Sequence, residues 1–262
     1  MPKVSIITVT YNAVSFVEET ILSVLGQDFH DYEYLVVDGG STDGTLEILK
    51  KYEGWLHFIS EPDKGIYDAM NKGIARSTGE WLYFLNAGDA FYSPGVLGEI
   101  FTEANVQNNL LIYGDVRTRN HPTGVERTIG HAVDISSFYY RVGLCHQAAF
   151  THRSAFDKFG NYNGKDFPIL ADQEWFVRFF QGNSPSIYLH RTIAYYEVVG
   201  ESYKKRLQNH HDHLRIVAKH FPARVRIINA LRNPWVLLKI WLLSHLATTR
   251  VYAWYRRLFF SR

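Results

Sequence analysis

Four apolar runs of the sequence each end in side chains that can bind polar ligands. The runs and the residues that follow them are Val4–Val9 with Thr10 and Tyr11, Tyr34–Val37 with Asp38, Leu56–Ser60 with Lys64 and Gly65, and Trp81–Leu85 with Asn86 and Asp89. Carboxylates and amides accept hydrogen bonds from hydroxyl groups or ligate a hard cation, and an aromatic face can stack on a flat ring. A lysine and a glycine before a helix suit an anionic phosphate. The clusters therefore point to a phosphorylated ligand with hydroxyl groups.

The apolar runs alternate with segments of helical periodicity, which would place the polar clusters at one edge of a sheet. Apolar residues recur at helical spacing from Phe16 to Leu25, and similar patterns follow the second and third runs. Repeated strand and helix units predict a mostly parallel sheet, and such sheets bind ligands beyond the carboxyl ends of their strands. The predicted fold class is therefore α/β, with helices on both faces of the central sheet.

The second half of the chain predicts a more mixed pattern. Strands are expected at Leu110–Tyr113, at two segments within 117–127 joined by a His-Pro-Thr-Gly turn, at His146–Thr151 and at Ile187–Val198. Helices are expected from Ser93-Pro94 to Phe101, at Arg153–Phe159 and at Glu174–Phe180.

Charge is divided unevenly along the 262 residues. Residues 1–212 carry 18 lysines and arginines against 26 acidic residues, whereas residues 213–262 carry 10 and no acidic residue. A body with a net charge of −8 would repel phosphate backbones, so a protein that binds nucleic acid over its whole surface is excluded. The glycine-rich phosphate loops of dinucleotide and P-loop sites are absent as well.

The cellular compartment is predicted from the single cysteine and from the first residues. Cys145 alone excludes a disulfide framework and favours a reducing compartment. The sequence enters a strand-like run at once, without a charged and then apolar leader. We therefore expect a cytoplasmic location.

Several motifs, in order, resemble those of family 2 glycosyltransferases. They are Ser5–Asn12, Val37–Thr45, Ser60–Gly73, Phe84–Asp89 and His146–Ala148. The resemblance spans residues 3–202 and is strongest to bacterial exopolysaccharide transferases of the colanic-acid type. It implies a GT-A fold and an inverting enzyme whose donor is a nucleotide diphosphate-sugar, often a UDP-sugar.

The resemblance assigns a first group of residues to the donor. Tyr11, with Thr10 beside it, is expected to stack on the base, and Asp38 to accept hydrogen bonds from the base imide or the ribose. Lys64 and Gly65 are expected to contact the diphosphate or its sugar. The open alternatives are that Tyr11 only covers the sheet edge and that Asp38 only caps a turn.

A second group is expected around the sugar and the leaving diphosphate. Asp68 and Asn71, three residues apart on one helix face, could bind sugar or ribose hydroxyls, or could be a solvated face. Asp89 is expected to contact Mn²⁺ or Mg²⁺, which would neutralise the departing diphosphate. Asn86 replaces the first carboxylate of the family's usual Asp-x-Asp and is expected at the ribose. His146 is expected beside the acceptor or diphosphate, with a structural histidine as the alternative.

The reaction that the resemblance implies needs a base to take the proton of the acceptor hydroxyl. Asp172 is the expected base, because it lies in Ala171–Arg178, which resembles the acidic segment that opens a helix in the family. Ala171 stands where a first acidic residue often occurs. Glu174 is the second candidate, although it could simply pair with Arg178 one turn later. The alternative for Asp172 is a helix cap.

Residues 213–262 are expected to form a helical tail after a catalytic domain of residues 1–212. Asn233-Pro234 is typical of a helix start, and Trp235–Leu243 is too short and interrupted to span a membrane. Arg250–Phe260 mixes aromatic residues with arginines, which suits a helix lying on an anionic membrane. The alternative is a hairpin packed on the body or on a second copy of the chain, which leaves a homodimer open.

Two further motifs lie after the closing strand. Gly200–Arg206 contains three consecutive cations that could fold over a diphosphate as a lid, or could be a solvated charge run. His210–His213 lacks the spacing of a helical zinc site, so a dedicated zinc site is not favoured.

The sequence thus predicts a glycosyltransferase that extends a lipid-linked oligosaccharide at the inner face of the cell membrane during polysaccharide biosynthesis. The altered Asn86 and Ala171 keep a second hypothesis open, namely a non-catalytic nucleotide-sugar-binding or scaffolding subunit. A third class, the sugar-nucleotide pyrophosphorylases, would need a glycine-rich loop after the first strand, and the sequence has none there.

Overall fold

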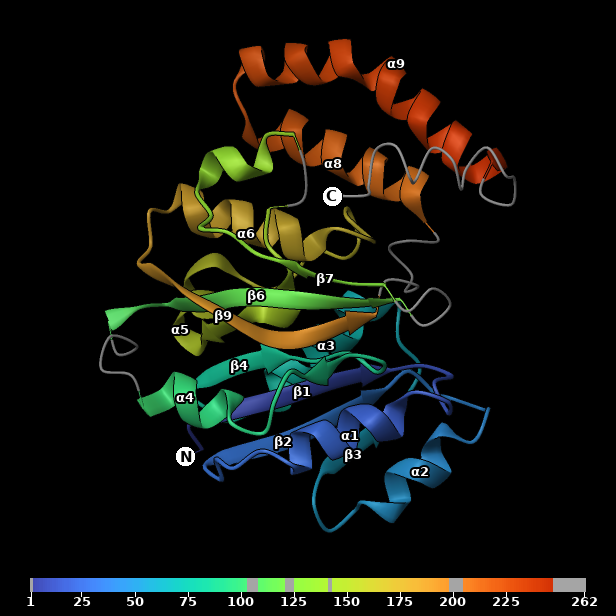
Figure 1. The fold of residues 1–262 in the computed structure, drawn as a ribbon, viewed down its shortest axis with the longest axis vertical. Coiled ribbons are helices and arrows are strands. Elements are labelled where there is room, and N and C mark those ends of the chain that lie inside the picture. Colours follow the sequence, from blue (N-terminus) through green and yellow to red (C-terminus); the bar gives the residue numbers. More distant parts are fainter. Residues whose placement is uncertain (1, 103–107, 121–124, 141–142, 198–204, 247–262) are drawn as a thin grey trace. The chain divides into compact units, whose positions relative to one another are not determined.

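The computed structural model describes residues 2–102, 108–120, 125–140, 143–197 and 205–246, and the chain divides into two compact units, residues 1–200 and 201–262 (Figure 1). The strands that the structure describes all lie in the first unit. The predicted boundary after Asp212 falls inside a helix of the second unit, α8 (Arg206–His220).

The first unit follows the alternating pattern that the sequence predicts. Its strands are β1 (Val4–Thr10), β2 (Tyr32–Asp38), β3 (His57–Ser60), β4 (Trp81–Phe84), β5 (Ala90–Phe91), β6 (Leu111–Asn120), β7 (Val125–Ile129), β8 (Ala149–His152) and β9 (Ser186–Glu197). Its helices are α1 (Val17–Leu25), α2 (Thr45–Lys51), α3 (Ile66–Arg76), α4 (Val96–Thr102), α5 (Arg153–Phe159) and α6 (Ala171–Gln181), with 3₁₀ turns η2 (Ile135–Phe138) and η3 (His146–Ala148).

The strands form one sheet in the order β3-β2-β1-β4-β8-β6-β9-β5, with β7 paired to β6. Strands β3, β2, β1 and β4 are parallel, whereas β8 is antiparallel to both β4 and β6. Strand β9 runs parallel to β6, and the short β5, which the sequence analysis does not anticipate, pairs with β9. The predicted α/β class is confirmed, with the parallel part in the first half of the chain.

Helices cover both faces of the parallel strands because successive side chains point to opposite faces. All seven residues of β1 are buried. Ile6 belongs to the core cluster that includes Ile21 of α1 and Leu49 of α2. On the other face, Gly73 of α3 lies so close to Ile7 that an added Cβ would come within 2.5 Å of its side chain. The glycine therefore lets α3 approach the sheet closely.

The polar clusters meet at one edge of this sheet, as predicted. Thr10 and Asp38 are register partners at the ends of β1 and β2, and Asp38 is also the partner of Ser60 at the end of β3. Because β8 is antiparallel to β4, its start lies at the edge where β4 ends. Turn η3 thereby reaches the same edge.

Three predicted boundaries differ from the structure. The strand expected from His146 begins at Ala149, because residues 146–148 form η3. The helix expected from Glu174 begins at Ala171, so Asp172 lies within its first turn. Ser93 and Pro94 form a turn rather than the first helical residues, and α4 begins at Val96, whose N–H faces the carbonyl of Ser93.

The second unit consists of α8 and α9 (Ala223–Leu246) in its described part. The helix start predicted at Asn233-Pro234 is wrong, because α9 begins eleven residues earlier, after Pro222, and contains Pro234 in its interior. A proline costs a helix one hydrogen bond and favours a bend, and Figure 1 shows α9 curving along its length. Within the described residues, no helix is long and apolar enough to cross a membrane.

Three motifs of the sequence analysis lie partly or wholly outside the described residues. They are the His-Pro-Thr-Gly turn at residues 121–124, Gly200–Arg206, of which only Lys205 and Arg206 are described, and Arg250–Phe260.

Candidate active site

Asp38 is buried beneath the turn that follows β2. Its side chain is fully shielded from solvent and accepts four hydrogen bonds: from the backbone N–H groups of Gly40 (3.1 Å) and Ser41 (2.9 Å) and from the hydroxyls of Ser41 (2.5 Å) and Ser60 (2.6 Å). The donors lie at the same sheet edge, in the turn after β2 and at the end of β3. In this structure the carboxylate therefore holds the turn, and its contact with a base or ribose stays a prediction.

Tyr11 and Thr10 lie beside this turn and differ in exposure. Tyr11 is 65% exposed, and an added Cβ on Gly39 would lie 3.4 Å from its ring. Thr10 is buried, and its hydroxyl has no hydrogen-bond partner. A buried hydroxyl without a partner costs free energy, so this position fits a site where a ligand supplies the missing hydrogen bond.

The loop before α3 presents backbone and charge to solvent. Gly65 has a φ of 113°, which favours glycine, and its N–H donates a hydrogen bond to Asp63 Oδ1 at 2.8 Å. Lys64 is exposed, and its N–H donates to Asp68 at 3.1 Å, so Asp68 braces the loop. Asn71 turns away from this loop. Its amide exchanges two hydrogen bonds with the backbone of Tyr162, at 2.9 and 3.1 Å.

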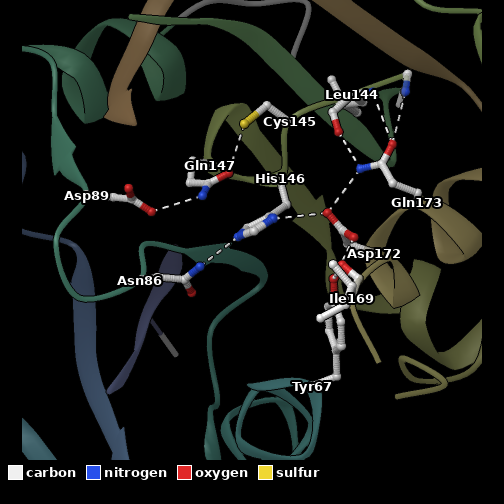
Figure 2. A network of polar contacts seen from close by, with 11 residues as sticks. Tyr67, Asn86, Asp89, Leu144, Cys145, His146, Gln147, Ile169, Asp172 and Gln173 are labelled. Atoms are coloured by element: carbon white, nitrogen blue, oxygen red, sulfur yellow. Dashed lines mark hydrogen bonds and ion pairs between the residues drawn. The ribbon is translucent and has the colours of Figure 1, made fainter. Parts of the chain in front are cut away.

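Asp172 is buried in the first turn of α6 and contacts three side chains (Figure 2). Tyr67 Oη lies 2.7 Å from Oδ1, while His146 Nδ1 (3.1 Å) and Gln173 Nε2 (3.0 Å) face Oδ2. Burial acts to raise the pKa of the Asp172 carboxyl, but its hydrogen bonds with His146, Tyr67 and Gln173 outweigh burial and lower this pKa. Asp172 is therefore ionised at neutral pH. The capping alternative is wrong, since the N-cap is Leu170.

His146 links Asp172 to Asn86, which lies in the loop after β4. Its Nδ1 faces Asp172, and its Nε2 lies 3.0 Å from the amide nitrogen of Asn86. If the amide nitrogen donates, His146 is neutral with its proton on Nδ1, pointing at the carboxylate. The Oδ1 atom of Asn86 is buried and has no partner, which leaves it open to a ligand.

Asp89, the predicted metal ligand, is buried in the loop after β4. Its Oδ2 accepts a hydrogen bond from Gln147 Nε2 at 2.9 Å, and its backbone oxygen accepts one from the Thr20 hydroxyl at 2.7 Å. Gln147 Oε1 in turn lies 2.8 Å from the Sγ of Cys145. Burial, followed by the charge of Asp89, raises the pKa of the Cys145 thiol, so this thiol stays protonated and is no nucleophile.

The donor atoms around Asp89 fit a hard divalent cation. Asp89 supplies a carboxylate, and the same loop carries the unpartnered Asn86 oxygen. Mg²⁺-like ions need only one or two protein oxygens when phosphates and water complete their coordination. In the described part of the chain, no group of three or more His, Cys, Asp and Glu side chains could hold a metal alone. The site suits a cation that binds together with a diphosphate.

Glu174, the second candidate base, is engaged elsewhere. It is 1% exposed, and its Oε2 lies 2.9 Å from Arg178 Nε, one helical turn away. The pairing expected from the i, i+4 spacing is confirmed, and it directs Glu174 away from the Asp172 network.

Three members of the network were not selected from the sequence: Tyr67, Gln147 and Gln173. Tyr67 lies in the Ser60–Gly73 motif and comes to Asp172 from another part of the chain, whereas Gln173 directly follows Asp172 in the sequence. The sequence did point to the position of Gln147, because this residue belongs to the His146–Ala148 motif.

Comparisons with known proteins agree on the family. The family model described as Glycosyl transferase family 2 matches residues 5–162. A PGL/p-HBAD biosynthesis glycosyltransferase of Mycobacterium tuberculosis is 34% identical over 208 residues, which cover 76% of this chain and 78% of the relative. The putative teichuronic acid biosynthesis glycosyltransferase TuaG of Bacillus subtilis is 40% identical over 92 residues, 34% of this chain and 36% of that protein.

Solved structures of low sequence identity share the fold. S. aureus TarS 1-349, crystallised with UDP, has a TM-score of 0.64 and 17% identity and covers 95% of this chain and 73% of its own. The mannosyltransferase PcManGT of Pyrobaculum calidifontis, in complex with GDP-Man and Mn²⁺, has a TM-score of 0.70 and 19% identity. The match covers 95% of this chain and 76% of PcManGT. From its sequence match, its relatives and its fold, the chain belongs to glycosyl transferase family 2 and is a glycosyltransferase with a GT-A-like fold.

Proposed function

We propose that this glycosyltransferase is an inverting enzyme that uses a nucleotide diphosphate-sugar and a divalent cation, with Asp172 as its catalytic base. The observation that carries the proposal is the buried, ionised Asp172 carboxylate, linked through His146 to Asn86 at the end of β4. A base at this position lies at the same sheet edge as Thr10 and Asp89. The UDP and GDP-Man of the two structural neighbours support this donor class.

The chemistry assigns a separate task to each residue. Asp172 accepts the proton of the acceptor hydroxyl as its oxygen bonds to the anomeric carbon and the bond to the diphosphate breaks. Asp89 would hold the cation, which supplies positive charge to the leaving diphosphate. Tyr11 and Asp38 bind the nucleoside. Lys64 and the backbone at Gly65 bind the diphosphate.

Substitution of the two central carboxylates tests the proposal. Asp172→Asn keeps the shape of the side chain but is no base, so sugar transfer should fall by about 10²–10⁴-fold. Asp89→Ala should abolish the stimulation by Mn²⁺. Glu174→Gln is the matched control, because it alters a buried carboxylate outside the network. Undiminished transfer in both Asp172→Asn and Asp89→Ala would refute the mechanism, and donor binding without transfer in the wild type would favour the non-catalytic alternative.

The donor is best identified by ligand stabilisation. A ligand that binds only the folded chain raises its melting temperature. We expect UDP-sugars with Mn²⁺ to give the largest increase among UDP-, GDP-, ADP- and TDP-sugars. A larger increase with a GDP-sugar would replace UDP in the proposal.

The proposed acceptor is a lipid-linked oligosaccharide at the inner face of the membrane, and α9 supports it. The side chains of Ile227, Leu231, Trp235 and Leu238 recur every three or four residues and are 46–74% exposed. Such spacing puts them on one face of the helix. The opposite face is used within the unit, where Val225 is buried and Asn233 Oδ1 lies 2.6 Å from His210 Nε2.

Charge favours an anionic lipid surface as the occupant of this face. Arg226, Arg232 and Lys239 are exposed and lie on helix positions that flank the apolar stripe, and residues 213–262 contain no acidic side chain. An amphipathic helix with cations at its borders lies at the boundary of head groups and acyl chains. We therefore assign the α9 face to peripheral membrane binding.

Vesicle sedimentation tests this assignment. The full chain should sediment with vesicles that contain phosphatidylglycerol and much less with pure phosphatidylcholine. Leu231→Glu with Trp235→Glu should release it, while Trp55→Glu, at an equally exposed tryptophan of the first unit, should not. Equal sedimentation of the two glutamate variants would refute the membrane role, and a change from dimer to monomer in the α9 variant would assign the face to a second copy.

A further inference from the structure

His146 and Gln147 are consecutive residues whose side chains reach two different carboxylates. His146 Nδ1 lies 3.1 Å from Asp172 Oδ2, and Gln147 Nε2 donates to Asp89 Oδ2 at 2.9 Å (Figure 2). Asp172 belongs to α6, and Asp89 to the loop after β4. A single turn, η3, therefore joins the proposed base to the proposed metal ligand.

The backbone of η3 is fixed on both sides. Tyr83, buried in β4, donates its hydroxyl proton to the carbonyl of Gln147 at 2.7 Å. Before the turn, Gln173 accepts from the N–H of Gly143 at 3.0 Å and donates to the carbonyl of Leu144 at 2.6 Å. After the turn, β8 begins at once and pairs with β4. The turn thus has little freedom to shift relative to either carboxylate.

The side-chain orientation of Gln147 follows from its two partners. The carboxylate of Asp89 can only accept, so the amide nitrogen must face it. The amide oxygen then accepts from the protonated thiol of Cys145 at 2.8 Å. Gln147 is 3% exposed, so neither contact competes freely with water.

We propose that His146 and Gln147 form a positioning pair that sets the distance and orientation of the base Asp172 relative to the metal ligand Asp89. Inverting transfer needs the base on one side of the anomeric carbon and the leaving diphosphate on the other. A small displacement of either group lowers the rate, because the reacting atoms must be aligned. His146 acts through Asp172 and Gln147 through Asp89, and neither residue needs to touch the substrate. The inference rests on the proposed function.

The two halves of the pair have separable tests. Gln147→Met keeps the size of the side chain but cannot donate to Asp89. It should lower kcat by about 10–100-fold, the usual effect of losing a partner of a metal ligand. It should also raise the Mn²⁺ concentration needed to reach half of the UDP-dependent increase in melting temperature, a measurement that needs no turnover. Gln27→Met is the matched control, because Gln27 is also buried and hydrogen-bonded, but to Ser23, Ser93 and Leu97.

For His146, the position of the remaining hydrogen-bonding group decides the outcome. The amide of His146→Asn falls near the former Nδ1 and can still donate to Asp172, whereas that of His146→Gln falls near Nε2 and reaches Asn86. We expect His146→Asn to retain at least about tenfold more kcat than His146→Gln, with the KM for the donor similar in both. His152→Asn, at a histidine on the far end of β8, should leave kcat unchanged.

The outcomes separate this inference from the proposed function. If Asp172→Asn and Asp89→Ala abolish transfer while Gln147→Met keeps its kcat and Mn²⁺ response, or His146→Asn and His146→Gln are equal, the positioning pair is wrong and the function stands. If Asp172→Asn and Asp89→Ala keep transfer, the proposed function itself fails. A Gln27→Met variant that shifts the Mn²⁺ response as much as Gln147→Met would reduce the role of Gln147 to general stability.

Discussion

Asp38 and Asp172 are both buried carboxylates at the same sheet edge, yet their surroundings differ. The four donors to Asp38 come from the turn that directly follows β2 and from Ser60 at the end of β3. The partners of Asp172 include Tyr67 of α3 and His146 of η3, far away in the sequence. A carboxylate held by its own turn stabilises local structure, whereas one held by side chains from several elements is oriented for another group. The difference teaches that burial alone does not identify a catalytic carboxylate.

Substitution of these two residues should separate activity from stability, and the effect on activity is the largest we expect. In Asp172→Asn, the new amide can donate to Tyr67 Oη while that hydroxyl donates to the carbonyl of Ile169, which lies 2.8 Å away. All groups keep partners, so the melting temperature should remain near that of the wild type while transfer falls as stated above.

Asp38→Ala should instead lower the stability of the fold, in addition to weakening nucleoside binding. It removes the acceptor of two backbone N–H groups and two hydroxyls, of which only the N–H and hydroxyl of Ser41 are buried. At about 1–3 kcal/mol for each of these two groups, the free energy of unfolding should fall by about 2–6 kcal/mol. Urea unfolding at neutral pH measures both variants. The comparison breaks if Asp172→Asn loses as much stability as Asp38→Ala.

The pH dependence of stability gives a smaller effect that belongs to Asp172. Its pKa is lowered in the folded chain, so its ionised form stabilises the fold above the unfolded pKa of about 3.9, and this contribution is lost as the pH falls through the folded pKa. The difference in unfolding free energy between wild type and Asp172→Asn should therefore change as the pH falls below about 5 and stay constant at higher pH. A difference that is constant over the whole range would contradict the lowered pKa.

Tyr67→Phe should sharpen the same point with a weaker effect. Burial, and then the charge of Asp172, raise the pKa of the Tyr67 hydroxyl, so it remains a proton donor to the carboxylate. Its loss should raise the pKa of Asp172 and move the acid limb of the pH profile of kcat upward, while kcat at neutral pH falls by less than about tenfold. An unshifted acid limb would show that Tyr67 only packs. Tyr83→Phe, which also removes a buried hydroxyl, is no control here because it loosens η3.

The sequence predicted the region around Asp38 better than that around Asp172, for a physical reason. Alternation of strands and helices is a local property, and parallel strands bring their carboxyl ends together, so Thr10, Asp38 and Asp89 could be placed at one edge. The contacts of Tyr67 with Asp172 and of Gln147 with Asp89 join distant segments, which periodicity does not encode. Likewise, Pro234 was read as a helix start because its local preference is strong, whereas α9 accepts it within a helix.

Gly65 gives the smallest expected effect and tests whether the donor side is as locally determined as Asp38 suggests. An added Cβ would meet no atom within 4 Å, so the cost of Gly65→Ala comes only from its φ of 113°. That conformation costs a residue with a side chain about 1–3 kcal/mol, which the exposed loop can relieve by changing shape. We therefore expect a small loss of stability and a rise of a few fold in the donor KM, with kcat nearly unchanged.

Gly54→Ala is the matched control, because a Cβ at Gly54 also has open space while Gly54 has no positive φ. If both variants leave the donor KM unchanged, the loop before α3 does not bind the donor through its backbone. A fall in kcat for Gly65→Ala alone would instead connect this loop to the network of Asp172, through Tyr67 in the first turn of the helix that the loop begins.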